Sequence, residues 1–129
     1  MIIGVGTDII ELEKVNNIIE NESFMRKYFT SNELEYILSK STKETKIESA
    51  GALFSGKEAV SKAIGTGFRG FSPIDIEIIH LDNLKPVVKL SDKSQQIALD
   101  IGIRRVDISL SHSKKYAIAF AVAQGDDTI

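Results

Sequence analysis

The sequence predicts an α+β fold in which a small antiparallel sheet packs with helices. The expected elements follow the order β-α-α-α-β-β-α-β-β, and strands that are neighbours in the sequence favour antiparallel pairing. The chain has 129 residues, of which 43% are hydrophobic and 26% charged, an ordinary composition for a protein with one core. No internal repeat or low-complexity segment divides it, so residues 1–129 are predicted to form a single domain.

Composition and charge argue against several classes of protein. The formal net charge of -2 argues against a nucleic-acid partner, and the absence of cysteine excludes disulfides and thiolate metal sites. The N-terminal segment MIIGVGTDIIEL lacks the basic stretch of a signal peptide. No apolar run reaches the length of a membrane span. We therefore expect a cytoplasmic protein with neither nucleic acid nor a membrane as partner.

The first expected element is a strand over residues 2–10, because apolar side chains alternate along it. Gly4, Gly6 and Asp8 lie together on the opposite face of this strand. Because glycine has no side chain, the two glycines beside Asp8 predict open space on that face.

Three helices are expected next. Apolar residues form one stripe in the first, Thr30 and Glu33 match a capping box before the second, and Gly65 suits the left-handed residue that ends the third. We expect these helices over residues 11–20, from Thr30 through Leu38, and over residues 48–64, with a polar loop over residues 41–48.

The remaining chain is expected to form four strands and one helix. Alanine alternates with large side chains in the last strand, so its alanine face can accept a closely packed helix. Ser91 can cap the helix and Gly102 can end it. We expect strands over residues 74–81, 87–90, 106–112 and 116–123, a helix from Ser91 through Ile101, and a loose tail over residues 125–129.

The segment GTGFRG, residues 65–70, matches the glycine pattern of a dinucleotide-binding turn. That motif requires a strand before it and a helix after it, whereas here a helix is expected before it. We therefore reject dinucleotide binding. The pattern favours a helix end followed by a turn, although a glycine backbone flanked by Lys62 and Arg69 can also bind a phosphate.

Glu58 and Lys62 are one turn apart on a helix that is otherwise nearly apolar. An exposed ion pair is the usual explanation of this spacing. Here, however, little polar surface remains to mark a face toward solvent. The two charges are therefore either desolvated or in contact with a ligand, and the residues alone leave the explanations open.

Asp8 has two interpretations as well. It can cap the helix that opens near Glu11, or it can bind a metal on the glycine-lined face of the first strand. Two carboxylates from separate elements suit Mg²⁺, which commonly takes one or two carboxylates together with phosphates and water. Ca²⁺ and Zn²⁺ fit less well, because the chain lacks an Asp-rich loop and the usual zinc ligands.

His112 ends the run SLSHS and shares a strand face with apolar residues, which favours a histidine packed in the core over a functional one. A serine hydrolase is excluded because no G-x-S-x-G motif occurs.

Several motifs together resemble the holo-[acyl-carrier-protein] synthases, the short, single-domain type of 4'-phosphopantetheinyl transferase. They are GVGTDIIEL, FSGKEAVSKAIGTG, DIEI, KP and SLSHSKKYAIAFAVA, in the family's order and spacing along essentially the whole chain. The resemblance implies the 4'-phosphopantetheinyl transferase fold and Mg²⁺-dependent transfer of 4'-phosphopantetheine from coenzyme A to a serine of apo acyl carrier protein. It further implies release of adenosine 3',5'-bisphosphate, a role in fatty acid biosynthesis, and a homotrimer with active sites between subunits.

The resemblance also assigns roles to single residues. Asp8 and Glu58 match metal ligands, Lys62 matches a lysine that meets the phosphates of coenzyme A, and His112 lies near the nucleotide's 3'-phosphate. The implied catalytic residues are Glu58, Lys62 and His112, with Glu58, directly or through a water, favoured over His112 as the base that accepts the serine proton. Contacts to coenzyme A are implied for Ser61, Lys62, Gly65, Thr66, Gly67, His112 and Ser113, and contacts to the acidic carrier protein are expected for Lys14, Arg26 and Lys27.

The chain departs from the family pattern at three positions. Leu53 replaces a customary arginine, Leu84 replaces a customary glycine, and Gly56 costs about 1 kcal/mol relative to alanine inside a helix. Two other functions are considered: an interaction domain without enzyme activity, in which Glu58 and Lys62 are structural, and a transferase acting on carriers of peptide or polyketide synthases. Members of that second branch are about twice as long, so the length disfavours it.

Overall fold

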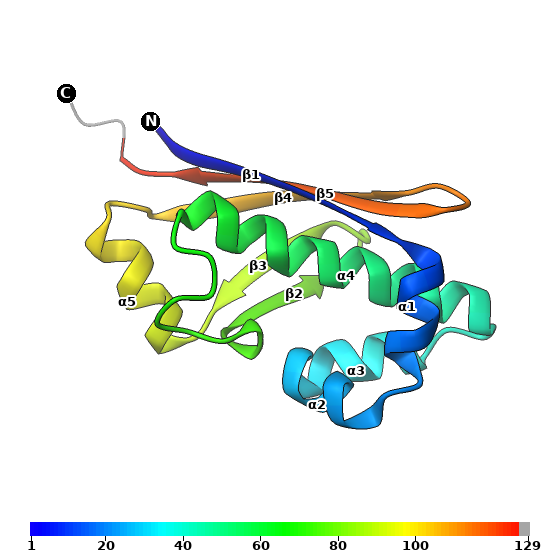
Figure 1. The fold of residues 1–129 in the computed structure, drawn as a ribbon. Coiled ribbons are helices and arrows are strands. Elements are labelled where there is room, and N and C mark those ends of the chain that lie inside the picture. The colour runs from blue at the N-terminus through cyan, green and yellow to red at the C-terminus, as the bar shows by residue number, and fades with distance from the viewer. Residues whose placement is uncertain (127–129) are drawn as a thin grey trace.

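A long helix lies between two antiparallel sheets in the computed structural model, which describes residues 1–126 (Figure 1). The larger sheet has the strand order β1-β5-β4, and the smaller one pairs β2 with β3. The strands are β1 (Ile2–Glu11), β2 (Ile76–His80), β3 (Pro86–Leu90), β4 (Arg105–His112) and β5 (Tyr116–Gln124). The helices are α1 (Leu12–Ile19), α2 (Glu22–Tyr28), α3 (Ser31–Leu38), α4 (Lys43–Ile64) and α5 (Asp92–Asp100), with a short 3-10 turn at Pro73–Asp75.

The predicted α+β class is confirmed, but the strands form two sheets rather than one. In Figure 1 the β1-β5-β4 sheet lies along one side of α4, while β2 and β3 lie on the other side. This position explains why residues 49–64 of α4 are mostly small or apolar, since the helix packs against both sheets and against α1 and α3. A helix buried on several faces has no solvent stripe for a sequence pattern to reveal.

The close approach of α4 to the larger sheet depends on small residues. Ala117, Ala119, Ala121 and Ala123 are all buried on the inner face of β5, as the alternation predicted. The glycine face of β1 is not open, contrary to the expectation. A side chain added at Gly6 would lie 2.1 Å from the carbonyl oxygen of Ala59, so the backbone of α4 fills that space.

The first half of the chain differs from the prediction in two ways. Helix α2 was missed. It begins after Asn21, whose side chain accepts a hydrogen bond from the N–H of Phe24, and it ends at Tyr28. Helix α4 begins at Lys43, because Thr42 caps it through Thr45, so most of the segment 41–48 is helical rather than a loop.

The other expected elements are confirmed within one or two residues, including the capping box of Thr30 and Glu33, the Ser91 cap of α5 and the left-handed Gly65. The predicted tail falls mostly on residues 127–129, outside the described residues. Within residues 1–126, no helix combines the length and apolar character needed to cross a membrane.

A buried ion pair joins α3 to α4. Lys57 and Glu33 are both fully buried and contact each other, and the Lys57 ammonium also donates to the carbonyl oxygens of Pro73 at 2.9 Å and Ile76 at 2.7 Å. Glu33 in turn accepts a hydrogen bond from the N–H of Ile78 at 2.9 Å. Burial raises the pKa of Glu33 and lowers the pKa of Lys57, and each partner opposes the shift of the other.

Gly56 and Ser55 on α4 have packing roles that the sequence did not explain. A side chain at Gly56 would lie 2.4 Å from the Cδ1 atom of Ile78, so glycine lets the smaller sheet approach the helix. Ser55 is buried on another side of α4, and its hydroxyl donates to the carbonyl of Ala117 at 3.4 Å.

Candidate active site

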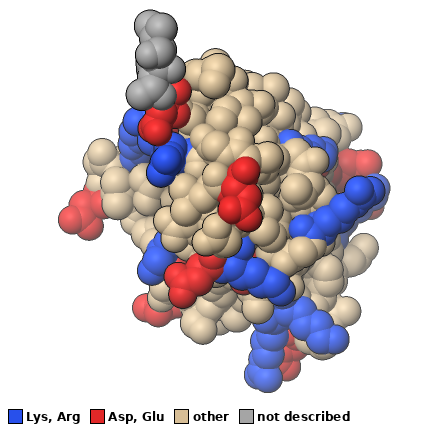
Figure 2. Space-filling model, turned by 90° about the vertical axis from the view of Figure 1, so that its left-hand side faces the viewer, with Lys and Arg blue, Asp and Glu red and all other residues tan. Residues whose placement is uncertain are grey.

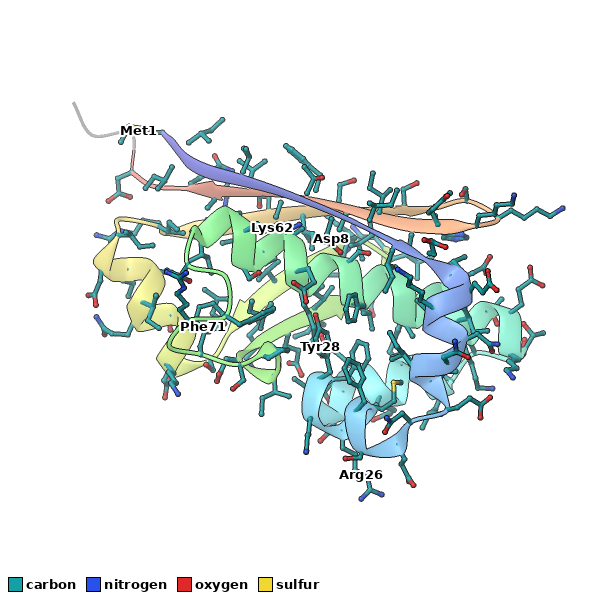
Figure 3. The ribbon with its side chains drawn as sticks, viewed as in Figure 1. Met1, Asp8, Arg26, Tyr28, Lys62 and Phe71 are labelled. Atoms are coloured by element: carbon teal, nitrogen blue, oxygen red, sulfur yellow. The ribbon has the colours of Figure 1, made fainter. Side chains whose placement is uncertain are left out.

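Asp8 and Lys62 meet where β1 crosses α4 (Figure 3), and Glu58 lies nearby, one helical turn before Lys62. Gly6 allows this crossing, and Asp8 follows it by two residues, so both lie on the face of β1 that looks toward the helix. The Lys62 ammonium donates to a carboxylate oxygen of Asp8 at 3.1 Å and to the carbonyl of Thr7 at 3.0 Å. Residues separated by about fifty positions in the chain thus share one site.

Lys62 pairs with Asp8 and not with Glu58, its neighbour along the helix. The side chain of Lys62 is 52% exposed, so it is not a charge stranded inside the core. The buried cation of α4 is Lys57, one residue before Glu58. Glu58 finds a different partner, because its Oε1 atom accepts a hydrogen bond at 2.8 Å from the hydroxyl of Tyr28.

Tyr28 is the site residue that sequence reasoning missed. Its ring is buried in a cluster with Phe24, at a centroid distance of 5.3 Å, and Phe54, at 4.6 Å. Burial, followed by the negative charge and the hydrogen bond of Glu58, raises the pKa of Tyr28 far above its usual range, and Asp8 adds to the same shift. The signal was available only after α2 was recognised, because Phe24 and Tyr28 are then one helical turn apart.

The two carboxylates fit a small divalent cation. Asp8 uses one oxygen on Lys62 and Glu58 uses one on Tyr28, and within residues 1–126 the second oxygen of each accepts no hydrogen bond. Neither of these second oxygens is a buried unpaired atom, so both are accessible to solvent or a ligand. Groups of three or more metal-binding side chains do not occur in the described part of the chain. Two carboxylates completed by substrate oxygens and water match the usual surroundings of Mg²⁺ rather than those of zinc or calcium.

The glycine loop after α4 lies close to these residues in the chain. Gly65 and Gly67 have positive φ angles of 95° and 60°, with no atom within 4 Å of the position of an added side chain. Their N–H groups both donate to the carbonyl of Ser61, and the Thr66 hydroxyl donates to the carbonyl of Gly67 at 2.9 Å. The loop is therefore open to a ligand, but the amides of both glycines are already used.

The predicted contact of Ser61 with coenzyme A stays a prediction. Its side chain is only 1% exposed, and its hydroxyl donates to the carbonyl of Glu58 at 2.7 Å. In this structure Ser61 supports the last turn of α4 and the start of the glycine loop.

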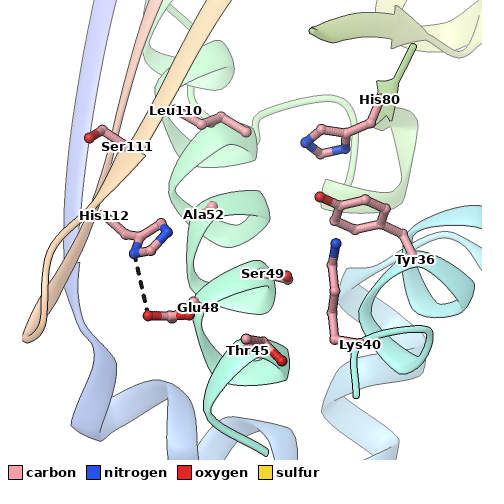
Figure 4. A pocket seen from close by; sticks show the side chains of 10 residues that line it. All are labelled: Tyr36, Lys40, Thr45, Glu48, Ser49, Ala52, His80, Leu110, Ser111 and His112. Atoms are coloured by element: carbon pink, nitrogen blue, oxygen red, sulfur yellow. Dashed lines mark ion pairs between the residues drawn. The ribbon is translucent and has the colours of Figure 1, made fainter. Parts of the chain in front are cut away.

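His112 and Ser113 lie apart from Asp8 and Glu58 within one chain. His112 contacts Glu48, with 3.5 Å between the Nδ1 and Oε2 atoms, and its side chain is half exposed rather than packed in the core (Figure 4). Glu48 precedes Glu58 by ten residues on α4, which corresponds to about 15 Å along a helix. Ser113 closes the hairpin between β4 and β5, where its hydroxyl accepts from the N–H of Tyr116 at 3.3 Å.

A cavity of about 310 Å³ adjoins His112 (Figure 4). One wall holds a stack of Tyr36 and His80, whose ring centroids are 4.2 Å apart, and Lys40 lies 4.3 Å from the Tyr36 ring. Burial, and then the positive charge of Lys40, lowers the pKa of His80. The residues lining the cavity are Tyr36, Lys40, Thr45, Glu48, Ser49, Ala52, His80, Leu110, Ser111 and His112.

Both leucines that depart from the family pattern have defined environments. Leu53 is fully buried in the core beside α1 and α3, so this leucine contributes packing and is not exposed to a ligand. Leu84 keeps a left-handed φ of 66°, a conformation that suits the customary glycine, and its side chain points into solvent with 76% exposure.

The basic residues expected to meet a carrier protein are on the surface. Lys14 extends from α1 and lies 3.9 Å from Glu11, and Arg26 extends from α2 and lies 3.1 Å from Glu22. Lys27 is exposed beside Arg26. Their contact with a carrier protein stays a prediction.

Known proteins resemble this chain over almost its whole length. A family model described as the 4'-phosphopantetheinyl transferase superfamily matches residues 4–121. A holo-[acyl-carrier-protein] synthase of Clostridium acetobutylicum is 50% identical over 126 residues, which are 96% of this chain and 98% of that protein.

Solved structures of proteins with the same name have a similar fold. A holo-[acyl-carrier-protein] synthase of Neisseria meningitidis has a TM-score of 0.87 and 31% identity, covering 96% of this chain and 99% of that one. A synthase of Bacillus anthracis in complex with coenzyme A (3',5'-ADP) has a TM-score of 0.81 and 33% identity, covering 98% and 99%. The resemblance drawn from the motifs is confirmed.

Proposed function

Because this chain belongs to the 4'-phosphopantetheinyl transferase superfamily, we propose that it transfers 4'-phosphopantetheine from coenzyme A to a serine of apo acyl carrier protein. The observation that carries the proposal is the family match over residues 4–121, with Asp8, Glu58 and Lys62 on one site inside the matched region. Similar proteins bear the name holo-[acyl-carrier-protein] synthase, and one was solved with coenzyme A. The proposed role is the activation of carrier protein for fatty acid biosynthesis in the cytoplasm.

The reaction moves a substituted phosphoryl group between two oxygens. The serine oxygen bonds to the phosphorus that carries pantetheine, and the bond from that phosphorus to the bridging oxygen of the pyrophosphate breaks. The leaving group, adenosine 3',5'-bisphosphate, keeps the electron pair, and the serine proton passes to a base. Such transfers depend on alignment and charge neutralisation more than on covalent catalysis by the protein.

We assign the groups of the site as follows. Asp8 and Glu58 would hold Mg²⁺, since within residues 1–126 each has a carboxylate oxygen that accepts no hydrogen bond, and Lys62 adds a positive charge on the same side. Bound Mg²⁺ would supply charge neutralisation for the pyrophosphate and the leaving phosphate. Lys62 is exposed and can turn from Asp8 toward a phosphate. Glu58, directly or through a water, is proposed as the base, because each of its carboxylate oxygens has a second lone pair that can accept a proton.

A direct assay tests the function. Purified protein, coenzyme A, Mg²⁺ and apo acyl carrier protein are mixed, and the carrier is weighed by mass spectrometry. The proposal predicts a gain of one phosphopantetheine, lost when the metal is chelated. An unmodified carrier, together with unchanged thermal stability of the protein on adding coenzyme A, would leave an interaction domain without enzyme activity as the better description.

Substitution of the carboxylates tests the metal assignment. Asp8→Asn and Glu58→Gln preserve shape but remove the charge that a hard cation needs, so each should lower kcat/KM by at least about a hundredfold. Asp107→Asn, a carboxylate exposed on β4 away from the site, serves as the matched control. Near-normal turnover of either site variant would refute its role as a metal ligand.

We further propose that the active unit is a homotrimer with sites between subunits. The outer face of the larger sheet carries exposed apolar side chains, among them Val5, Ile9, Ile118 and Phe120, which are 40–60% exposed. In the end-on view of Figure 2 this upper surface has few charged side chains except beside the grey residues. An apolar patch of this kind indicates a protein interface.

A site shared between two subunits would bring His112 and Ser113 of one copy beside Asp8 and Glu58 of another. His112 and Ser113 lie at the end of β4, on the sheet edge opposite β1 and Asp8, so a neighbouring copy is proposed to supply them beside coenzyme A. Mixing inactive Asp8→Asn subunits with inactive His112→Ala subunits should restore part of the activity. Mixtures that stay as inactive as their components, although subunits exchange, would place each complete site within one chain.

Carrier recognition is proposed to use Lys14, Arg26 and Lys27. Opposite charges raise association rates, and added salt weakens that effect. Lys14→Glu should therefore raise the KM for the carrier protein and reduce its dependence on salt. An unchanged KM over the same salt range would remove Lys14 from the docking surface.

A further inference from the structure

The position of Glu58 depends on a neutral donor rather than on a cation. Its Oε1 atom accepts the hydroxyl of Tyr28 at 2.8 Å, while the nearby ammonium of Lys62 is occupied by Asp8 and Thr7. A phenol with an ordinary pKa near 10 is protonated at neutral pH, so it donates a hydrogen bond without neutralising the carboxylate. The contact with Tyr28 therefore orients Glu58 without bringing a positive charge to it.

The donor itself is held in place by packing. The Tyr28 ring stacks nearly parallel to Phe24 and Phe54, with interplanar angles of 12° and 15°, and meets the edge of Phe29 at a centroid distance of 5.2 Å. A buried ring enclosed on several sides has little freedom to rotate its hydroxyl away from Glu58. Helix α2 thereby places the Tyr28 hydroxyl at the site.

We propose that Tyr28 is a positioning residue, which fixes one oxygen of Glu58 so that the other faces the cation site. This inference rests on the proposed function, because it needs Glu58 as a metal ligand. The physical reason is that partners of a ligating carboxylate set its orientation before the metal arrives. Without the hydroxyl, nothing in residues 1–126 holds Oε1, and the side chain gains rotamers that face away from Asp8.

The variant Tyr28→Phe tests this proposal, because it removes the hydroxyl and retains the stacked ring. Mn²⁺ is titrated calorimetrically into protein saturated with coenzyme A, without carrier protein. The expected result is a Kd for Mn²⁺ raised about 10–100-fold, the usual cost of losing a partner of a metal ligand. In the transfer assay the Mg²⁺ concentration for half-maximal rate should rise similarly, while kcat at saturating Mg²⁺ recovers most of its value.

Tyr116→Phe is the matched control, since it removes a phenol hydroxyl at an exposed position of β5. It should leave the Kd for Mn²⁺ unchanged. A Tyr28→Phe protein with lowered thermal stability but normal Mn²⁺ affinity would reduce Tyr28 to a packing residue and overturn the inference alone. A wild-type protein that binds no Mn²⁺ and transfers without Mg²⁺ would overturn the metal assignment and the inference together.

Discussion

Removing the buried ammonium of Lys57 should destabilise the protein severely. Lys57→Met keeps most of the aliphatic volume but leaves the Glu33 carboxylate in the core without a compensating charge. It also leaves the carbonyl oxygens of Pro73 and Ile76 without their donor. Each of these buried groups has lost its bond to water on folding, so an orphaned partner costs free energy in the folded state only.

The size of the effect follows from these contacts. Breaking a fully buried ion pair from one side costs about 3–5 kcal/mol, whereas domains of this kind are stable by about 5–15 kcal/mol. At about 4 °C per kcal/mol for a chain of this length, Tm should fall by about 12–20 °C. Urea unfolding followed by circular dichroism gives the free energy, and a thermal scan gives Tm.

Lys62→Met is the matched control on the same helix. Its ammonium is 52% exposed and pairs with Asp8, so the expected loss of stability is below about 1 kcal/mol. Adding Glu33→Gln to Lys57→Met should recover part of the loss, because no uncompensated charge then remains. A loss under about 1 kcal/mol for Lys57→Met alone would show that Glu33 is solvated or protonated without cost, and the reasoning about this pair would be wrong.

Two further substitutions test other parts of the structure. Gly6→Ala should cost about 3 kcal/mol or more and lower activity, because its Cβ would meet backbone atoms of α4 at 2.1 and 2.7 Å and push Asp8 away from Lys62. Thr7→Ala, exposed on the other face of β1, should cost well under about 1 kcal/mol, and equal losses in urea unfolding would contradict the packing argument. The lowered pKa of His80 means that the folded state binds this proton less readily than the unfolded state. The neutral imidazole therefore contributes its full stability above about pH 6.5, the pKa in the unfolded chain, and this contribution is lost as pH falls through the lower pKa of the folded state. His80→Phe keeps the stack on Tyr36 and should reduce that loss of stability between pH 7.5 and 5, whereas an NMR titration placing the His80 pKa above 6.5 would refute it.

Local patterns in the sequence predicted most of the secondary structure, because short-range physics decides it. The capping residues Thr30 and Ser91, the left-handed Gly65 and the alanine alternation of β5 all act over a few residues. Helix α2 was missed because its seven residues are too few to show a clear apolar period, and the Asn21 cap was overlooked.

For the candidate site, too, the sequence predicted some features and the structure alone revealed others. Motif matches predicted Asp8, Glu58 and Lys62 as site residues, and the structure places Lys62 in contact with Asp8. Their actual pairing could not be read from spacing, because an i, i+4 relation says which residues are neighbours on the helix but not which atoms β1 and α2 bring to them. Tyr28 could not be found without the position of α2, which brings the Tyr28 hydroxyl to Glu58.

The sequence by itself determined the α+β class and the family, since each is carried by residue types in a fixed order, and it predicts Asp8 and Glu58 as the carboxylates of the site. Only the tertiary structure decided which charges of α4 are buried. Lys57 and Lys62 have the same helix propensity and lie on the same helix. Lys57 points to α3 and the smaller sheet, where it is buried, whereas Lys62 points to Asp8 on β1, where solvent reaches it. Burial depends on what packs against each face of a helix, and here elements from both ends of the chain supply that packing.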